Sequence, residues 1–324
     1  MTTICAEIQV KDADWILGEC LRHLSDFVDE VVAFDDGSSD LTLPLLLSWP
    51  CVKKIFRKPT SGVWTESENR ALLLDMAKTS GKEWILFIDS DEILEARAAR
   101  GIKTFLQERP EISTWKCGEI NLWNSTHTYR CDDWFGFGKD NFPQFVRFFR
   151  NDPDLVYRHT EGLHGNLVPV NVKYPVLNSG FNILHFAFFD PIRRQRKAAY
   201  YRERDVSLRN ASEDDPLLIM NVKRLVSTPK LPLVEVDTSW WTHGQVELPL
   251  LDCDAPVGPF IQHDSDTRNR VWGKALWGNW DKSGKVWFGT PTCESREVTR
   301  HELVLLYFEA KRSGKDICEL FQRS

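Results

Sequence analysis

A fully apolar run that stops at a pair of acids constrains the fold of this chain more than any other feature. Residues 84–88 read WILFI, and Asp89-Ser90-Asp91-Glu92 follows at once. An unbroken apolar run of this length is typical of a strand buried on both faces, and such strands belong to parallel sheets covered by helices. Acids directly after such a strand lie at its carboxyl end, where open α/β sheets bind ligands.

Residues 1–110 repeat this alternation of strands and helices. Apolar runs predict strands over residues 4–10, 30–34 and 52–56, and helical spacing predicts helices over 14–24 and 65–78. The strand at 30–34 also ends in acids, within the segment DDGSSD at residues 35–40. The pattern predicts an α/β fold with a mostly parallel sheet, and we expect both acidic clusters to face one crevice.

From about residue 112 the pattern changes to strands separated by polar loops, expected over residues 113–123, 144–150 and 182–189. Asp190-Pro191 predicts the start of a helix that runs to about residue 208, because Asp is a favoured N-cap and Pro fits the first helical position. Residues 225–260 are typical of loops and short strands, and residues 296–312 and 314–322 of terminal helices. We expect a first domain over residues 1–210 and a C-terminal extension over residues 211–324.

Charge and cysteine content narrow the class of protein. There are 47 acidic and 41 basic residues, so the net charge is −6, which argues against a general duplex-DNA binder. The eight cysteines show no paired spacing, which favours reduced thiols over a disulfide framework or a zinc site. We see neither a secretory leader nor a run of about 18 apolar residues that could span a membrane, and expect a cytoplasmic protein.

Each acidic cluster has a chemical and a structural interpretation. Asp89 and Asp91, two residues apart after a buried strand, can converge on one Mg²⁺ or Mn²⁺ ion. Alternatively, Asp91 or Glu92 caps a helix that begins near Leu94. The cluster at residues 35–40 can hydrogen-bond a ribose or a base, or it is a turn in which Asp40 caps a short helix. There is no G-x-G-x-x-G and no G-x-x-x-x-G-K-[ST], which argues against a dinucleotide-binding domain or a P-loop.

Five segments, in order over residues 3–205, carry a resemblance to the family 2 nucleotide-sugar glycosyltransferases. The opening is VKDADWILGECLRHLSDFVDEVVAFDDGSSDLT, the D-x-D segment is WILFIDSDE, and Asn69-Arg70-Ala71 stands between them. VRFFRNDPDLVYRHTEGLHGNLVP is similar to the R-L-F-R-N … G-x-x-H block of the subgroup that acts on lipopolysaccharide and related glycans. LHFAFFDPIRRQRKAAYY resembles the H-(Y/F) … R-x-x-K-x-x-x-Y block that follows.

The resemblance implies a glycosyltransferase-A (GT-A, Rossmann-like) fold, a nucleoside-diphosphate sugar donor, foremost a UDP-sugar, and an inverting hexosyl or pentosyl transfer that needs Mn²⁺ or Mg²⁺. It implies that Asp36, with Asp35 beside it, holds the base or ribose and that Arg70 neutralises the diphosphate. Asp89 would contact the ribose and a metal-bound water, and Asp91 would ligate the metal. His185, or as the second choice His164, would be a further ligand of the metal or the diphosphate. The resemblance does not extend to the C-terminal extension, for which the tryptophans between residues 240 and 287 suggest acceptor binding or, alternatively, core packing.

The chain departs from the family pattern in two places. Asp12-Ala13 stands where the family often has Asn-Glu, and His164-Gly165 where the subgroup often has His-Glu. The Gly165 departure leaves the general base open, with Asp190, Glu161, His164 and Asp133 as candidates.

Two further groups of residues are candidates for substrate contact. Seven Lys and Arg residues lie from residue 193 to residue 209. Most of them are expected on a solvated basic face, and one or two of Arg193, Arg196 and Lys197 are candidates for contact with the diphosphate. Asp133 and Trp134 are candidates for the acceptor site, because tryptophan stacks on sugar rings.

Three other functions remain open at this point. A nucleotidyltransferase would share the fold, although its Gly-rich basic loop is absent. A non-catalytic sugar-binding protein would fit the loss of the Glu at residue 165. A glycosyltransferase acting on a modified nucleic-acid base would fit the basic segment after residue 190. A glycan acceptor is favoured over nucleic acid because of the acidic net charge.

Overall fold

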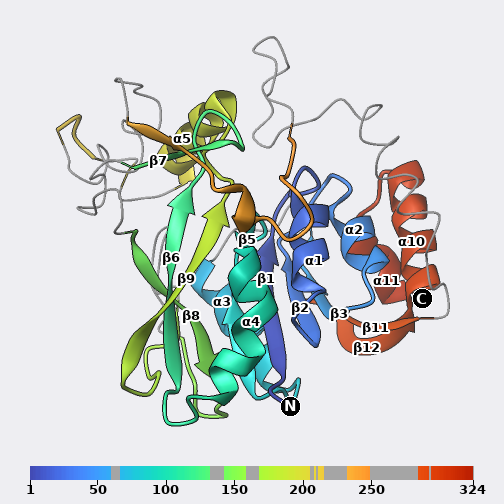
Figure 1. The fold of residues 1–324 in the computed structure, drawn as a ribbon. Coiled ribbons are helices and arrows are strands. Elements are labelled where there is room, and N and C mark those ends of the chain that lie inside the picture. Colours follow the sequence, from blue (N-terminus) through green and yellow to red (C-terminus); the bar gives the residue numbers. More distant parts are fainter. Residues whose placement is uncertain are drawn as a thin grey trace. The chain divides into compact units, whose positions relative to one another are not determined.

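The computed structural model describes residues 1–59, 66–131, 142–157, 168–204, 208, 211–214, 232–248, 284–291 and 293–323. The chain forms two compact units (Figure 1). The N-terminal unit comprises residues 3–90, 151–154 and 261–324, and the central unit comprises residues 1–2, 91–150 and 155–260.

The N-terminal unit is built on a mostly parallel sheet. Its described strands follow the order β12-β11-β3-β2-β1-β4. Neighbouring strands run parallel, except that β12 is antiparallel to β11. The strands are β1 (Ile4–Val10), β2 (Glu30–Asp35), β3 (Val52–Arg57), β4 (Trp84–Phe87), β11 (Lys285–Thr290) and β12 (Cys293–Thr299).

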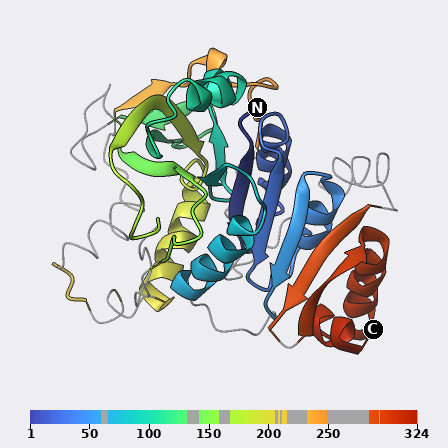
Figure 2. The same cartoon turned by 90° about the horizontal axis from the view of Figure 1, so that it is seen from below.

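Helices cover both faces of this sheet. Helices α1 (Leu17–Leu24) and α2 (Thr42–Ser48) connect strands that step outward from β1, whereas α3 (Glu66–Lys78) leads back to β4 on the other side of β1. Because β-α-β crossovers are right-handed, this reversal places α3 on the opposite face from α1 and α2, as Figure 2 shows. Every residue of β2 and β4 is buried, which confirms the prediction from the apolar runs.

The predicted helix over residues 296–312 is wrong at its start. Residues 293–299 form strand β12, and helix α10 (Arg300–Ser313) begins directly after it, followed by α11 (Ile317–Arg323). The sequence of β12, CESREVT, lacks an apolar run. Edge strands often carry charged side chains, which discourage pairing of their open backbone edge with another chain, and Arg296 and Glu297 of β12 are exposed. Thr299 is both the last residue of β12 and the N-cap of α10, in a capping box with Glu302.

The central unit contains a mixed sheet with the strand order β8-β6-β9-β5. Strands β6 and β9 are parallel, and the pairs β8–β6 and β9–β5 are antiparallel. The strands are β5 (Glu92–Leu94), β6 (Thr114–Asn121), β8 (Gln144–Arg150) and β9 (Val176–His185). Around them lie α4 (Ala96–Gln107), α5 (Pro191–Arg204), the strand pair β7 (Thr128–Arg130) and β10 (Leu233–Glu235), and the short helix η2 (Thr238–Trp240).

Two local predictions for the central unit are wrong. The strand expected over residues 182–189 runs instead from Val176 to His185, and its half-exposed first part hid it from the hydrophobic pattern. The alternative in which Asp91 or Glu92 caps a helix near Leu94 also fails. Residues 92–94 are strand β5, and the N-cap of α4 is Glu95.

The described residues confirm the fold class as a mixed, mostly parallel sheet flanked by helices. The predicted boundary at residue 210 stays a prediction, because residues 209–210 and 215–231 lie outside the described ranges. The cysteines within these ranges are unbridged. No helix in the described part of the chain is both long enough and apolar enough to cross a membrane.

Candidate functional site

The strand order of the N-terminal unit reverses beside β1. Strands β2 and β3 extend the sheet in one direction from β1, and β4 pairs with its other side. Such a reversal is where open α/β sheets bind ligands, beyond the carboxyl ends of the strands. Lys11 and Asp12 follow β1, Asp36 follows β2, and Asp89 follows β4. Both predicted acidic clusters therefore emerge at the same edge of this sheet.

Residues 36–40, here called the acidic loop, have a tightly held backbone. The ammonium group of Lys11 donates to the carbonyl oxygens of residues 36 and 37 at 3.0 and 2.7 Å. Arg57 donates to the carbonyl of residue 38 at 2.8 Å. The last two carbonyls accept hydrogen bonds from α10, through Lys311 to residue 39 and Tyr307 to residue 40. Every carbonyl of the acidic loop thus accepts a hydrogen bond from a side chain outside it.

Asp12 secures the same loop from the side of its N–H groups. Its carboxylate accepts hydrogen bonds from the backbone N–H of Ser39 at 2.6 Å and from the Ser39 hydroxyl at 3.1 Å. Its own N–H donates to the Ser38 hydroxyl at 2.9 Å. Asp12 has φ +44° and Gly37 φ +73°, both in the left-handed region, which Asp tolerates better than most side chains. The departure noted at Asp12 therefore has a structural role.

Asp35 and Asp36 lie in different environments. Asp35 is fully buried and ion-paired with Arg57, and its second oxygen accepts the Ser38 N–H at 2.8 Å. Burial acts to lower the pKa of Arg57, but the Asp35 charge holds that pKa above its ordinary value. Asp35 is thus already engaged within the fold, which leaves Asp36 as the carboxylate available to a ligand.

The pKa of Asp36 is raised to about 6, chiefly because burial disfavours its charged form. The cations Lys58 and Lys11 oppose this shift, and the Lys58 ammonium lies 3.9 Å from the Asp36 carboxylate. A buried carboxyl held between two cations can accept hydrogen bonds from the N–H or O–H groups of a ligand.

Arg70 and Asp89, predicted to act in the same site, contact each other. The Arg70 guanidinium, on α3, lies 2.7 Å from the Asp89 carboxylate and 3.8 Å from that of Glu66. It also stacks over the ring of Phe87, 4.3 Å from the centroid. Arg70 is buried, whereas the side chain of Asp89 is 34% exposed. The cation is therefore fixed beside an accessible carboxylate at the end of β4.

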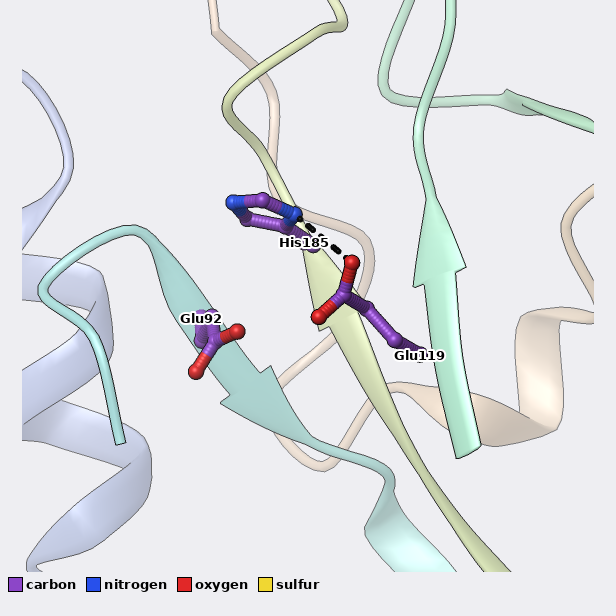
Figure 3. A group of neighbouring side chains, drawn as sticks. All are labelled: Glu92, Glu119 and His185. Carbon is purple, nitrogen blue, oxygen red and sulfur yellow. Dashed lines mark ion pairs between the residues drawn. The ribbon is translucent and has the colours of Figure 1, made fainter. Parts of the chain in front are cut away.

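The central unit brings a second group of charged side chains together around His185, the last residue of β9. Strand β9 lies between β5 and β6, so that His185 is paired in register with Glu92 on one side and Asn121 on the other. Figure 3 shows Glu119 pointing at the His185 ring. Glu92, Glu119 and His185 place ligand-type atoms within 4.8 Å of one another.

The two ring nitrogens of His185 face different partners. Nδ1 lies 2.9 Å from the amide oxygen of Asn121 and 3.4 Å from Glu119. Nε2 lies 3.7 Å from the carboxylate of Asp91, and the Asp91 backbone is held by a 2.8 Å hydrogen bond from the N–H of Phe186. Burial acts to lower the pKa of His185, but the charges of Glu119 and Asp91 prevail and raise it to about 9.

Arg147 neutralises the two glutamates of this group. It donates to both oxygens of Glu92 at 2.8 and 2.6 Å and to Glu119 at 3.0 Å. Arg147 occupies a bulge of β8, where the pairing with β6 shifts between Trp115 and Lys116. Bulges commonly redirect a side chain in this way. Arg147 lies in the segment VRFFR, but its partners are distant in sequence and only the fold reveals them.

The basic helix α5 begins as predicted, with Asp190 as its cap. Asp190 is fully buried, and one of its oxygens accepts the N–H groups of residues 192 and 193 at 2.8 and 2.9 Å. Arg194 is buried over the ring of Trp123 and donates to Asn124 at 2.8 Å. The Lys197 ammonium lies 4.9 Å from the centroid of the Phe188 ring. Arg196 is half-buried on the same helix.

Four predicted site residues lie outside the described ranges: Asp133, Trp134, Glu161 and His164. The roles predicted for them remain predictions. Besides Arg147, sequence reasoning missed six residues that the structure places in these two groups, namely Lys11, Arg57, Tyr307, Lys311, Glu119 and Asn121. None of these six lies in a recognisable motif, apart from the proximity of Lys11 to the first strand.

Comparison with known proteins gives distant similarities. No family model matches the chain. Uncharacterized proteins of Mycobacterium bovis and Mycobacterium tuberculosis are each 27% identical over 190 residues, which covers 56% of this chain. The chain spans only 40% of the length of these relatives.

The solved structures that resemble this chain do so only weakly, in both sequence and fold. S. aureus TarS 1–349 in complex with UDP-GlcNAc is 13% identical with a TM-score of 0.39, covering 69% of this chain and 83% of that one. Glucosyl-3-phosphoglycerate synthase from Mycobacterium tuberculosis, in complex with Mg²⁺ and UDP, is 18% identical with a TM-score of 0.28, covering 36% of this chain and 44% of that one. The fold assignment above rests on the observed strand order.

Proposed function

We propose that this chain is a metal-dependent, inverting glycosyltransferase of the GT-A type. It would move a sugar from a nucleoside-diphosphate sugar, foremost a UDP-sugar, to a hydroxyl group of a glycan acceptor. One observation carries the proposal. At the strand-order reversal beside β1, the acidic loop with Asp36 and the Arg70–Asp89 pair emerge at one edge of the sheet. This is where an open α/β sheet binds a nucleotide.

In the proposed donor site, two carboxylates contact the nucleoside and basic side chains contact the diphosphate. Asp36 accepts hydrogen bonds from the base or the ribose, and Asp89 contacts the ribose. Arg70 supplies a fixed positive charge for the diphosphate, whose negative charge grows as it leaves. Because Arg70 is held by Asp89 and by the Phe87 ring, it needs little reorganisation when the donor arrives. Arg196 and Lys197 on α5 are the further cations proposed for the diphosphate.

Asp91 and His185 are the residues proposed to hold the divalent cation. The Asp91 carboxylate lies 3.7 Å from Nε2 of His185, while Nδ1 is occupied by Asn121. Because the pKa of His185 is raised to about 9, the cation would have to displace the proton on Nε2. A carboxylate with one imidazole suits Mn²⁺, and Mg²⁺ with added water ligands. The metal would serve as a Lewis acid toward the diphosphate. Glu92 and Glu119 are less available as ligands, because Arg147 already pairs with both.

The proposed reaction is a single displacement. The acceptor oxygen forms a bond to C1 of the sugar, the bond from C1 to the diphosphate oxygen breaks, and the anomeric configuration inverts. The acceptor proton passes to a general base, for which the candidates are Asp190, Glu161, His164 and Asp133. Asp190 is engaged as the helix cap, which favours the other three. Asp133 and Trp134 are proposed to contact the acceptor.

A thermal-shift screen tests the donor. UDP, GDP, CDP and dTDP would be added singly, with and without Mn²⁺, and the nucleotide that matches the site should raise Tm by mass action. We expect UDP with Mn²⁺ to give the largest shift. No shift with any nucleotide would refute the proposal.

Turnover and stereochemistry test the reaction itself. Release of UDP from a UDP-sugar, with NMR of the product anomer, establishes transfer and inversion. Pyrophosphate formed from a sugar 1-phosphate and UTP would indicate a nucleotidyltransferase. Binding without transfer to any acceptor, glycan or nucleic acid, would indicate a sugar-binding protein.

A further inference from the structure

Helix α10 reaches the acidic loop from the far end of the chain. Tyr307 is buried, and its hydroxyl donates to the carbonyl of Asp40 at 3.0 Å, across 267 residues of sequence. Lys311 stands one helical turn later on the same face and donates to the carbonyl of Ser39. The Lys311 ammonium also lies 5.7 Å from the centroid of the Tyr307 ring. The two side chains therefore form one contact surface on the loop.

The start of α10 is anchored independently of the loop. Arg300 is buried and donates to the carbonyl of Leu47, at the end of α2, at 2.5 Å. It also donates to the carbonyl of Val52, at the start of β3. The capping box at Thr299 and the pairing of β11 with β3 fix the segment before it. Because the helix is held at its first residue, its later turns can impose a conformation on the acidic loop.

The hydrogen bonds from α10 add to those that residues after β1 and at the end of β3 donate to the carbonyls of the acidic loop. Lys11 and Arg57 hold the first three carbonyls of the loop, and α10 holds the last two. A loop fixed in this way before its ligand arrives loses less conformational entropy on binding. The side chain of Asp36, carried by the same loop, is then presented in one position.

We propose that Tyr307 and Lys311 are positioning residues for the nucleotide, acting through the acidic loop rather than by touching the donor. The C-terminal segment from residue 285 would then be part of the donor site. This inference rests on the proposed function for its consequence in binding, but the ordering of the loop can be measured without any nucleotide.

Three variants and one matched control test the proposal. Tyr307→Phe removes one hydroxyl, Lys311→Met removes one ammonium, and the double variant removes both. Arg312→Met is the control, because Arg312 is exposed on the same turn of α10. Amide hydrogen exchange of a peptide covering residues 36–41 reports the order of the loop in the free protein.

A single variant removes one hydrogen bond of about 1 kcal/mol net, so we expect its loop exchange to rise about fivefold. The double variant should exchange faster still, and Arg312→Met should match the wild type. The Kd for UDP, and the KM for the UDP-sugar, should rise by a similar factor at nearly constant kcat. Lys311→Arg should restore both values, because a guanidinium can donate to the same carbonyl.

The outcomes separate this proposal from the proposed function. Unchanged loop exchange in the double variant overturns the positioning role, whatever UDP does. Faster exchange with an unchanged Kd for UDP overturns its importance for binding. If the wild type binds no nucleoside diphosphate, the proposed function fails, and hydrogen exchange alone then decides whether α10 orders the loop.

Discussion

The acidic loop of the N-terminal unit and the His185 group of the central unit are held in different ways. The loop is fixed through its backbone, each carbonyl accepting a hydrogen bond from a side chain of another element. The His185 group is fixed through its side chains, since Arg147 pairs with two glutamates, one of which also contacts His185.

The two regions should therefore respond differently when a single contact is removed. A loop held by several hydrogen bonds, each worth about 1 kcal/mol net, loses its order in steps. A buried charge network fails at once when one member is removed, because the remaining charges are left uncompensated. We therefore expect substitutions in the His185 group to cost more stability than substitutions of Lys11, Tyr307 or Lys311 at the acidic loop. Arg57 is the exception, because it also pairs with buried Asp35.

Arg147→Met should give the largest loss of stability. It removes the guanidinium that donates to both oxygens of Glu92, which is 1% exposed, and removing one partner of a buried ion pair typically costs about 3–5 kcal/mol. Urea denaturation measures this loss. Arg109→Met is the matched control, since Arg109 pairs with exposed Glu108 at 3.7 Å and exposed pairs are worth less than about 1 kcal/mol. Equal losses in both variants would contradict the distinction.

Asp89→Ala and Asp91→Ala test the chemistry at the chain segment after β4. Each should lower donor consumption by at least about a hundredfold, because neutralising a departing diphosphate is worth several kcal/mol. Circular dichroism should show that both variants remain folded. Retained activity in both would remove the metal assignment.

The pH dependence of stability tests the acidic loop. In the folded protein the pKa of Asp36 is raised to about 6, whereas the ordinary pKa of an aspartate is 3.8. Between these values the folded state binds more protons than the unfolded state, so stability falls as the pH rises. The stabilising effect of this proton is complete below about pH 4 and is lost by about pH 6.

Asp36→Asn should remove this dependence. Between pH 4 and pH 7.5 the wild type should lose stability relative to the variant by on the order of 2 kcal/mol, as measured by denaturation at each pH. If the stability of the two proteins changed with pH in the same way, burial would not raise the pKa of Asp36.

Asn121→Leu should have the smallest effect, and it tests whether Asn121 orients the His185 ring. It removes the oxygen that lies 2.9 Å from Nδ1 of His185, and the loss of such a partner typically weakens metal binding about ten- to a hundredfold. Mn²⁺ titration followed by electron paramagnetic resonance measures the affinity. Asn121→Asp keeps an acceptor and should retain most of it. Equal weakening in both would mean that Asn121 does not orient the ring.

Local sequence patterns were enough to predict the first four strands of the N-terminal unit. Strands β1, β2 and β4 are buried almost throughout, β3 buries its apolar residues Val52 and Ile55, and acids follow β2 and β4. The same reasoning failed for β12, whose residues are mostly polar because the strand is at the sheet edge. It also misplaced β9, where half-exposed residues at the start of the strand give no apolar run.

The candidate site was only partly predictable for a related reason. Asp36, Asp89 and Asp91 follow strands, so their position made them candidates, and the family resemblance then favoured a chemical role over a structural one. Tyr307 and Arg147 act on groups that are remote in sequence, 267 residues away for Tyr307 and 55 for the Arg147–Glu92 pair. No local pattern encodes such contacts, since they depend on the pairing of β11 with β3 and on the bulge in β8.

Because α10 makes contacts at both of its ends, the number of residues between these contacts cannot change without breaking one of them. Its first residue, Arg300, contacts the end of α2, and Lys311 contacts the segment before the start of α2, so α10 spans α2 as a strut of set length. One inserted residue would rotate all later side chains by about 100° and advance them by about 1.5 Å. Tyr307 and Lys311 would then turn away from the acidic loop. Substitutions at the exposed Leu305 and Phe308 should be tolerated, whereas insertions or deletions between Arg300 and Lys311 should not.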